Sequence, residues 1–556
     1  MLPRDMDVGP AEEEEEDGAS MVPEYAGARA GCAHRHAVLA WVLAGVLAVV
    51  AVALAAVVAL GAARGLRPGA CPADARPSVV LFIGDGFGPQ MTSLVRLLAA
   101  AEANVTTSPA PFETLTKPSA QCQLSFTQTR SASAIVTDSA AAGTALATAH
   151  KTTNGFVGVV PDPDGSSSKV VPVGNVLEAA KLAGYATGVV VTSGVTHATP
   201  AAFTAHVASR NAYEQIALQQ ATLQKGVVDV LVGGGRDNFA AATRADGRDL
   251  IAELTGAGVT VVQDRTELLA ATRIPLVALL APGHLAYAID RESHDAAARD
   301  AQPTLCESVE KALALLRADG RPFFLMVEGS KIDMAAHTND AAAAVHEARA
   351  YADALSAAVA DAQRHGDTLV LATSDHDTGG LSITAATNIA RLRAINASCE
   401  HMATVIRAAG ATDEAITATL ARYTPFADPS ASELAHIRTA GDTANAVAEV
   451  LSARLGLEWG AHDHTATNVL TYTCLGGWRL ADACVPDTAR LPVLIDNTDI
   501  PRFISDRCRS SLDQATKRAV DVFSGHTNSV SVSSPSALDP VDLKFHSFSH
   551  VNNNNN

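Results

Sequence analysis

The chain has 556 residues, of which 48% are hydrophobic, so it is long enough to bury a large core. Its net charge is −18 and only 4% of its residues are aromatic. These values argue against nucleic acid as a partner, because phosphate backbones are bound by clustered Lys and Arg and unstacked bases by aromatic rings.

The N-terminal 63 residues indicate a membrane anchor. Residues 1–36 carry three Arg against nine Asp and Glu, which predicts a disordered acidic tail on the cytosolic side. Residues 37–63 contain no charge and no proline, and as a helix they would extend roughly 40 Å against a hydrocarbon core of about 30 Å. We expect a transmembrane signal-anchor helix. The alternative is a cleaved signal peptide, whose apolar core is normally shorter and nearer the N-terminus.

The orientation of this span depends on features beyond it, because arginines flank it on both sides and the positive-inside rule barely decides. Two glycosylation sequons, at Asn104 and Asn396, lie C-terminal to the span, as do seven of the eight cysteines. Disulfides are therefore plausible, and since seven is odd at least one cysteine is free or pairs between chains. We predict a single-pass type II membrane protein with a lumenal or extracellular body.

After a stalk at residues 64–77, short apolar segments alternate with helical patterns. This order predicts an α/β fold with a large, mostly parallel sheet and helices on both faces. Residues 400–457 look helical and are expected to form a cap or insertion, and residues 526–556 are expected to form a disordered tail. The predicted strands are Val79–Ile83, Thr187–Val191, Val227–Val232, Pro275–Leu280, Pro322–Val327 and Thr368–Ala372, and the predicted helices include Asn175–Leu182, Glu307–Arg317 and Asp340–Ala362.

Ser139 follows Asp138 at the start of an Ala-rich run that is expected to be a helix. The first turn of a helix has free N–H groups and a partial positive charge, so it suits a phosphate oxygen. A serine hydroxyl becomes a good nucleophile near neutral pH only with a base or a metal beside it. Asp and Ser are also common at ordinary helix caps, so this motif alone is weak.

Carboxylates and imidazoles follow several predicted strands. Functional groups collect beyond the C-terminal ends of parallel strands, so these residues could meet near Ser139. Each taken alone also fits a turn, a strand end or a solvated loop. Their mutual repulsion would be costly without cations, and mixed Asp/His sets suit Zn²⁺ whereas oxygen ligands suit Mg²⁺. The residues are Asp85, Glu328, Asp333, His337, Asp375, His376, His462 and His464.

From about Ser78 to Thr473 the chain resembles the alkaline phosphatases, especially the membrane-anchored vacuolar type of fungi, with every expected motif in order. The resemblance implies a catalytic domain at residues 78–525 that hydrolyses phosphate monoesters with broad specificity through a phosphoserine intermediate. It implies two Zn²⁺ and one Mg²⁺ per subunit, a homodimer, and a vacuolar or other endomembrane location, with the plasma membrane as an alternative. It does not indicate the physiological substrate.

The resemblance also assigns roles to single residues. Ser139 resembles the phosphorylated nucleophile, and Arg210 the guanidinium that grips two phosphate oxygens. His464 is preferred over His462 because the family's ligand directly precedes Thr or Ser. The implied ligands are Asp333, His337 and His464 for one zinc, Asp85, Asp375 and His376 for the second, and Asp85, Thr199 and Glu328 for magnesium, with His197 contributing indirectly.

Two positions depart from the family pattern. His197 stands where bacterial members often have Asp, and an imidazole there should weaken magnesium binding. Met334 stands where His or Lys is expected, and a thioether cannot help hold phosphate. A related phosphodiesterase, sulfatase or phosphopentomutase would share the two-metal core but would be less expected to carry Arg210 with Thr199 and Glu328. An inactive phosphate- or metal-binding membrane protein is the alternative from another class.

Overall fold

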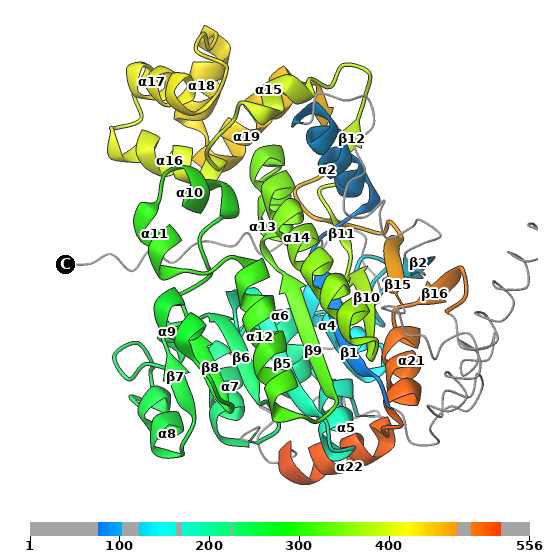
Figure 1. Cartoon of the computed structure of the whole chain (residues 1–556). Helices are drawn as coiled ribbons and strands as arrows, with labels where there is room; N and C mark the ends of the chain where they lie inside the picture. The colour runs from blue at the N-terminus through cyan, green and yellow to red at the C-terminus, as the bar shows by residue number, and fades with distance from the viewer. Residues whose placement is uncertain (1–75, 103–121, 163–168, 224–225, 475–490, 524–556) are drawn as a thin grey trace, which may run out of the picture. The chain divides into compact units, whose positions relative to one another are not determined.

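The computed structural model describes residues 76–102, 122–162, 169–223, 226–474 and 491–523 (Figure 1). The predicted acidic tail, transmembrane span, most of the stalk, the sequon at Asn104 and the C-terminal tail lie outside these ranges. Within the described ranges, no helix combines the length and the apolar character that crossing a bilayer requires.

A ten-stranded sheet organises the body, in the order β16-β2-β15-β10-β1-β9-β5-β6-β8-β7. Only β15 runs against the other nine strands, so the predicted mostly parallel sheet is confirmed. The strands are β1 (Ser78–Gly84), β2 (Cys122–Gln128), β5 (Ala186–Gly194), β6 (Val230–Gly234), β7 (Thr260–Val262), β8 (Leu276–Leu279), β9 (Phe323–Gly329), β10 (Thr368–Ser374), β15 (Val469–Cys474) and β16 (Leu494–Asp496).

The third predicted strand begins later than expected. The sequence predicts strand from Val227, but β6 starts at Val230. The polar Asp229 precedes it, and its carboxylate accepts hydrogen bonds from Lys181 Nζ at 2.7 Å and from the backbone N–H of Thr187 at 2.9 Å. Asp229 therefore anchors the start of the neighbouring β5 instead of continuing the apolar run.

Helices cover both faces of the sheet because alternate strand residues point to opposite sides. Along β1, Val80 and Phe82 enter one hydrophobic cluster, whereas Leu81 and Ile83 enter the other. The predicted helices are confirmed, and Figure 1 shows α12 and α14 in front of the sheet. The first cluster packs against α12 (Leu305–Asp319) and α14 (Ala341–His365), and the second against α4 (Ser139–Thr148), α5 (Val176–Leu182) and α6 (Ala198–Thr204).

Four helices occupy the stretch where the sequence predicts a cap, and we call residues 399–455 the helical layer (Figure 1). Each begins after a Ser, Thr or Asp whose side chain accepts a hydrogen bond from a first-turn N–H, which satisfies one of the free donors there. The helices are α16 (Cys399–Ala408), α17 (Asp413–Tyr423), α18 (Ala431–Thr439) and α19 (Thr443–Leu455).

One disulfide joins Cys122 on β2 to Cys474 on the adjacent β15. Among the cysteines in the described ranges, Cys306, Cys399 and Cys508 are unpaired. The sequence left the pairing open, and the structure places this bond between two neighbouring strands at one end of the sheet.

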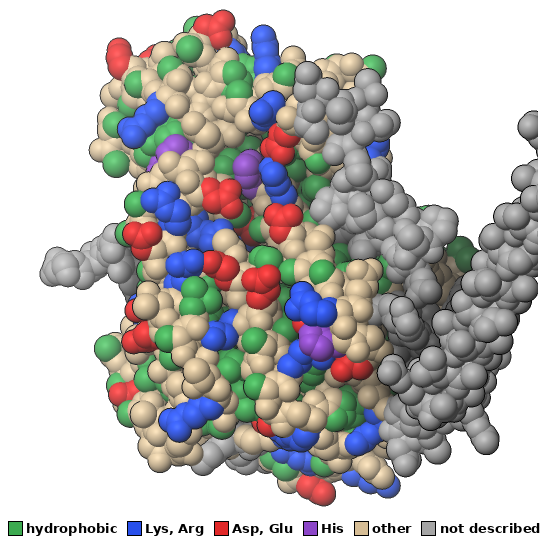
Figure 2. Space-filling view, viewed as in Figure 1, with side chains coloured by type: hydrophobic (Ala, Val, Ile, Leu, Met, Phe, Trp, Pro, Cys, Tyr) green, Lys and Arg blue, Asp and Glu red, His purple; other side chains and the backbone are tan. Residues whose placement is uncertain are grey.

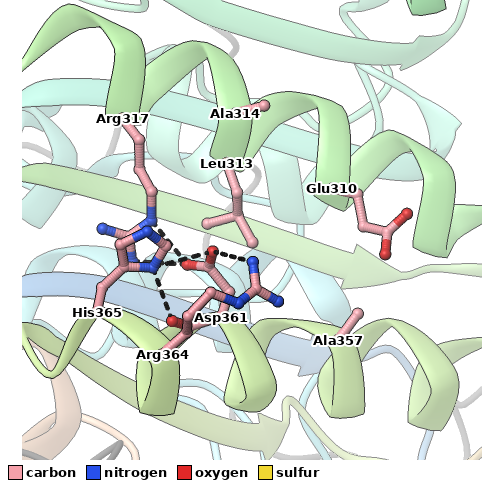
Figure 3. A pocket seen from close by; sticks show the side chains of 8 residues that line it. All are labelled: Glu310, Leu313, Ala314, Arg317, Ala357, Asp361, Arg364 and His365. Carbon is pink, nitrogen blue, oxygen red and sulfur yellow. Dashed lines mark hydrogen bonds and ion pairs between the residues drawn. The ribbon is translucent and has the colours of Figure 1, made fainter.

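A surface groove between α12 and α14 is lined by groups that pair with one another (Figure 3). Arg317 Nε donates to Asp361 Oδ2 at 2.8 Å, and His365 Nδ1 lies 3.3 Å from Asp361 Oδ1. Figure 2 shows acidic and basic side chains interspersed over this face. Arg317 and His365 precede the beginnings of β9 and β10, so the groove lies at the sheet edge opposite the strand ends that carry the candidate ligands.

Candidate active site

The candidate ligands meet beyond the C-terminal ends of three neighbouring strands. Asp85 follows β1, Glu328 lies near the end of β9, and Asp375 and His376 follow β10. These strands are adjacent in the order β10-β1-β9, and their ends are in register at Gly84. The predicted groups from separate parts of the chain therefore share one edge of the sheet.

Two local features bring further ligands to this edge. Gly86 has φ of 70°, and a Cβ there would lie 2.7 Å from Asp333 Cα, so only glycine lets α13 (Lys331–His337) approach the turn after β1. The short strands β11 (Asp377–Thr378) and β14 (His464–Thr465) pair with each other. This pairing sets the His464 ring against that of His376, with 3.6 Å between the ring centroids.

Ser139 is the first residue of α4 and is buried. Its hydroxyl oxygen lies 3.1 Å from His376 Nε2 and 3.5 Å from Asp85 Oδ1. Asp138 caps the helix by accepting from the N–H of Ala141 at 2.9 Å. The hydroxyl is thus held at a helix N-terminus, among residues able to bind a cation.

Arg210 reaches the same region from the segment after α6. Its Nη1 donates to Asp138 Oδ2 at 3.2 Å, and its Nη2 lies 3.4 Å from His197 Nε2. Asp138 therefore both caps α4 and fixes the guanidinium beside Ser139. An Arg held in this way is a suitable partner for phosphate oxygens, which accept paired N–H donors.

Three groups of side chains have the spacing of metal ligands, with their donor atoms within 4.8 Å of one another. Asp85 belongs to two of these groups. His337 adjoins the group around Asp333, since its Nε2 lies 3.4 Å from Asp333 Oδ2. The structure thus brings together the predicted Asp, Glu and His ligands, and the predicted ligand Thr199 is buried on α6. The groups are Asp85, Asp375 and His376; Asp85, His197 and Glu328; and Asp333, His376 and His464.

The imidazoles of His337 and His464 are oriented for metal binding. His337 Nδ1 donates to the carbonyl of His462 at 2.6 Å, and His464 Nδ1 donates to the carbonyl of Thr137 at 2.8 Å. A neutral ring with its proton on Nδ1 carries its lone pair on Nε2. The two Nε2 atoms face each other at 3.1 Å, an arrangement that a cation between them stabilises.

Thr378 orients His376 in the same sense. Its hydroxyl donates to Asp333 Oδ1 at 2.6 Å and lies 3.2 Å from His376 Nδ1, from which it accepts. His376 Nε2 is then free to face Ser139 and Asp85. One threonine therefore connects the two clusters that are predicted to hold zinc.

The buried carboxylates show most clearly that the side chains present suit bound metal ions. Asp85 Oδ2, Asp375 Oδ2, Glu328 Oε1 and Thr199 Oγ1 are all buried without a hydrogen-bond partner. Burial raises the pKa of Asp85 well above its usual value, with Asp375 adding to the effect. Uncompensated acidic groups of this kind are stabilised by bound cations, so the residues present fit a multi-metal centre.

A sequence model of the family described as alkaline phosphatase matches residues 77–506, well over half of the chain. The chain belongs to the alkaline phosphatase family. The alkaline phosphatase of Schizosaccharomyces pombe is 38% identical over 288 residues, which cover 49% of this chain and 50% of that protein. The repressible alkaline phosphatase of Saccharomyces cerevisiae is 37% identical over 305 residues, which cover 50% of each. The chain thus spans about half the length of the curated relatives it matches.

Solved structures support the same alkaline phosphatase fold. The Thermus thermophilus alkaline phosphatase has a TM-score of 0.68 at 28% identity and covers 80% of this chain and 95% of its own. A cold-active alkaline phosphatase from Shewanella sp. has a TM-score of 0.63 at 30% identity, and the match covers 77% of this chain and 99% of that one. The large α/β sheet of this family therefore holds the site.

Sequence reasoning missed two contacts in this alkaline phosphatase site. Thr378 stands two residues after His376, but nothing in the sequence shows that its hydroxyl reaches Asp333. The hydrogen bond from Arg210 to Asp138 joins residues that lie 72 positions apart in the sequence. Met334, which departs from the family pattern, is partly buried and packs against the core.

The metal-free protein is expected to lose thermal stability as the pH rises from about 6.5 to about 8. Burial raises the pKa of Asp375 to about 6 and that of Glu328 to about 8, from ordinary values of 3.8 and 4.5. The folded state therefore prefers the protonated acids, so stability begins to fall where the unfolded chain ionises and falls until the folded pKa is passed. One pKa unit corresponds to about 1.4 kcal/mol, so the loss from Glu328 across this window amounts to about 2 kcal/mol.

Below about pH 6.5 the buried His197 and His376 oppose this fall, because burial lowers their pKa values and the unfolded rings bind more protons there. Asp333 does not offset the fall above that pH. Burial opposes its ionisation, but the imidazoles of His337 and His464 overcome that effect and hold the pKa of Asp333 well below 3.8. Its stabilising contribution is therefore complete above about pH 4 and constant across the window. Melting temperatures with and without chelator would check the prediction. A metal-free melting temperature that does not fall across this range would contradict it.

Proposed function

We propose that this chain hydrolyses phosphate monoesters through a phosphoserine intermediate, with two Zn²⁺ and one Mg²⁺ and with broad specificity. The observation that carries the proposal is the position of the Ser139 hydroxyl, 3.1 Å from His376 Nε2 and 3.5 Å from Asp85 Oδ1, within converging groups of metal-ligating side chains. Membership of the alkaline phosphatase family supports it.

The ligand sets follow the predicted assignment. Bound there, the cations would supply Lewis acidity that lowers the pKa of a nearby hydroxyl and stabilises the entering and leaving oxygens of an in-line displacement. One zinc would be held by Asp85, Asp375 and His376. The other zinc would be held by Asp333, His337 and His464. Magnesium would be held by Asp85, Thr199 and Glu328.

The chain's own residues perform the remaining tasks. Ser139 Oγ attacks phosphorus as the bond from phosphorus to the ester oxygen breaks, and the alcohol leaves with a proton. Water then attacks the phosphoserine, which releases inorganic phosphate and restores the Ser139 hydroxyl. Arg210 donates to two phosphate oxygens and offsets the charge that develops on them. Asp138 holds Arg210 in place at 3.2 Å, so the guanidinium is preorganised before the substrate arrives.

Added Mg²⁺ is expected to activate the purified zinc-loaded enzyme. Arg210 Nη2 faces His197 Nε2, so the proton of the neutral His197 ring lies on Nδ1, which is 4.0 Å from Asp85 Oδ2. Burial, with help from Arg210, lowers the pKa of His197 well below its usual value and keeps the ring neutral. A ring N–H cannot ligate a metal, so His197 acts indirectly and leaves magnesium one carboxylate fewer.

The measurement is phosphatase activity after selective removal of Mg²⁺ with zinc retained, followed by titration of Mg²⁺. His197→Asp serves as the matched variant, since it restores a carboxylate and should reach full activity at lower Mg²⁺. Full wild-type activity after Mg²⁺ removal would refute the prediction.

Comparison of a nitrophenyl phosphate monoester with the corresponding diester tests the proposed function. We expect hydrolysis of the monoester to dominate, to be lost with EDTA and to return with Zn²⁺ and Mg²⁺. A preference for the diester or for a sulfate ester would favour a related metallohydrolase. Metal binding without hydrolysis of any ester would favour an inactive binding protein.

The cellular setting is proposed from the sequence. We infer that residues 37–63 anchor the chain in a membrane and that the active site faces the lumen. The proposed location is the vacuole or another endomembrane, and the alternative is the plasma membrane. The enzyme is proposed to be a homodimer. Asn104 and Asn396 would be glycosylated, and Asn396 is exposed. Deglycosylation followed by electrophoresis tests the last point, with Asn396→Gln as the matched variant. An unchanged mobility would overturn it.

A further inference from the structure

His462 lies beside the candidate metal ligands without joining them. Its Nδ1 donates to the carbonyl of His337 at 2.9 Å, while His337 Nδ1 donates to the carbonyl of His462 at 2.6 Å. The two residues therefore form a reciprocal pair of hydrogen bonds. This pair ties the last residue of α13 to the segment that leads into β14 and His464.

Helix α19 of the helical layer supports this pair from behind. Glu449 Oε1 lies 3.3 Å from His462 Nε2. One turn later on the same helix, Ser452 donates to the carbonyl of Asn339 at 3.2 Å and accepts from Trp459 Nε1 at 3.0 Å. The helix thus contacts both the segment after His337 and the segment before His464.

This arrangement addresses a physical difficulty of the site. His337 and His464 belong to separate elements, yet their Nε2 lone pairs face each other at 3.1 Å. Without a cation or a proton between them two such acceptor atoms repel, so the spacing of the two segments must be held by other contacts. The backbone carbonyl of His462 holds the His337 ring, and the His462 side chain fixes the two segments at that spacing through the reciprocal hydrogen bond. Loss of such support behind a ligand typically changes metal affinity about 10–100-fold.

We infer that His462, held by Glu449 of α19, is a positioning residue that keeps His337 at ligand spacing from His464. Through Glu449 the helical layer adds a smaller, indirect support to zinc affinity at the Asp333, His337 and His464 set. This inference rests on the proposed function, because it concerns the affinity of one of its zinc ions. It assigns to His462 a role distinct from that of a ligand.

If His462 only formed a surface ion pair with Glu449, the expected effect of its loss on zinc affinity would be different. Glu449 also contacts His436 Nε2 at 2.7 Å, and both side chains are nearly half exposed, at 43% and 48%. Exposed pairs of this kind contribute about 0–1 kcal/mol to stability and nothing to a distant ligand. If His462 served only such a pair, its loss would leave zinc affinity unchanged.

Two substitutions separate the two contacts of His462. His462→Asn places an amide N–H near the position of Nδ1, so it keeps the donor to His337 and loses Glu449. His462→Gln places its amide near Nε2, so it keeps Glu449 and loses the donor. His436→Ala is the matched control, because it removes a contact of Glu449 that does not involve His337.

The experiment measures zinc retention of the full chain in competition with a chelator, the absorption spectrum of the Co²⁺-substituted protein and the melting temperature. His462→Gln and His462→Ala should lower the affinity of one zinc by about 10–100-fold and alter the Co²⁺ spectrum. His462→Asn should remain within about threefold of the wild type, and His436→Ala should not differ from it.

Equal zinc affinity in the wild type, His462→Asn and His462→Gln would overturn the inference. If His462→Ala does not fold, the Asn and Gln variants still decide, since each retains one hydrogen bond. A wild-type protein that binds no zinc would instead refute the proposed function, so the two failures are distinguishable.

Discussion

Replacement of Ser139 by Ala is expected to lower kcat/KM for phosphate monoesters on the order of 10⁴-fold or more. The hydroxyl lies 3.1 Å from His376 Nε2 at the N-terminus of α4, and the structure shows it as the oxygen that the candidate ligands surround. Removing it takes away the attacking atom but leaves the ligands and Arg210. The variant should therefore still bind zinc and inorganic phosphate.

A covalent-trapping experiment checks this directly. Wild-type protein incubated with labelled phosphate and quenched in acid should carry a labelled serine, and Ser139→Ala should carry none. Ser133→Ala is the matched control, because Ser133 lies exposed in the loop before α4 and should leave both labelling and turnover close to wild type. Labelling that persists in Ser139→Ala would place the nucleophile elsewhere.

Replacement of Asp85 by Asn is expected to weaken the binding of two metal ions at once. Asp85 belongs both to the group with Asp375 and His376 and to the group with Glu328 and His197. An amide of the same shape removes the charge from both, so activity should fall on the order of 10³-fold and bound Zn²⁺ and Mg²⁺ should fall together. Metal analysis by mass spectrometry, together with the monoester assay, measures both.

The same substitution should act in opposite directions on the two forms of the protein. Burial and the neighbouring Asp375 raise the pKa of Asp85 well above its usual value, so a neutral amide relieves an unfavourable charge in the metal-free state. Asp85→Asn should raise the melting temperature of the metal-free protein and lower that of the metal-loaded one. Asp463→Asn is the control, since Asp463 lies outside all three groups. Loss of a single metal from Asp85→Asn would contradict the bridging role.

The fold could be predicted where apolar runs match the environment of the strand. Central strands such as β1 and β10 are buried on both faces and read as continuous apolar segments. β2 was missed because its pattern is inverted, with Leu124 and Phe126 exposed and Thr127 turned inward. Thr127 Oγ1 forms a hydrogen bond with Thr471 Oγ1 of β15 at 2.6 Å, so hydroxyl pairing replaces the hydrophobic signal there.

The candidate site could be predicted from chemistry-bearing residues at strand ends, but the contacts behind them could not. The choice of His464 over His462 came from the residue that follows it, and the structure places His464 Nε2 3.5 Å from Asp333 Oδ1. Its role as a ligand stays a prediction. Thr378 and Glu449 act through hydrogen bonds between distant segments, and no spacing rule in one sequence reveals such contacts.

The wide separation of the site residues along the chain bears on how the protein matures. The hydrogen bond between His464 and Thr137 joins positions 327 residues apart, and the two halves of the site meet only through the folded sheet. A nascent polypeptide lacks His464 until translation has passed that residue, long after Thr137 has been synthesised. If the chain binds the proposed ions, their full complement can be acquired only after this histidine has been synthesised, and truncated products ending before it should emerge with a deficient metal content.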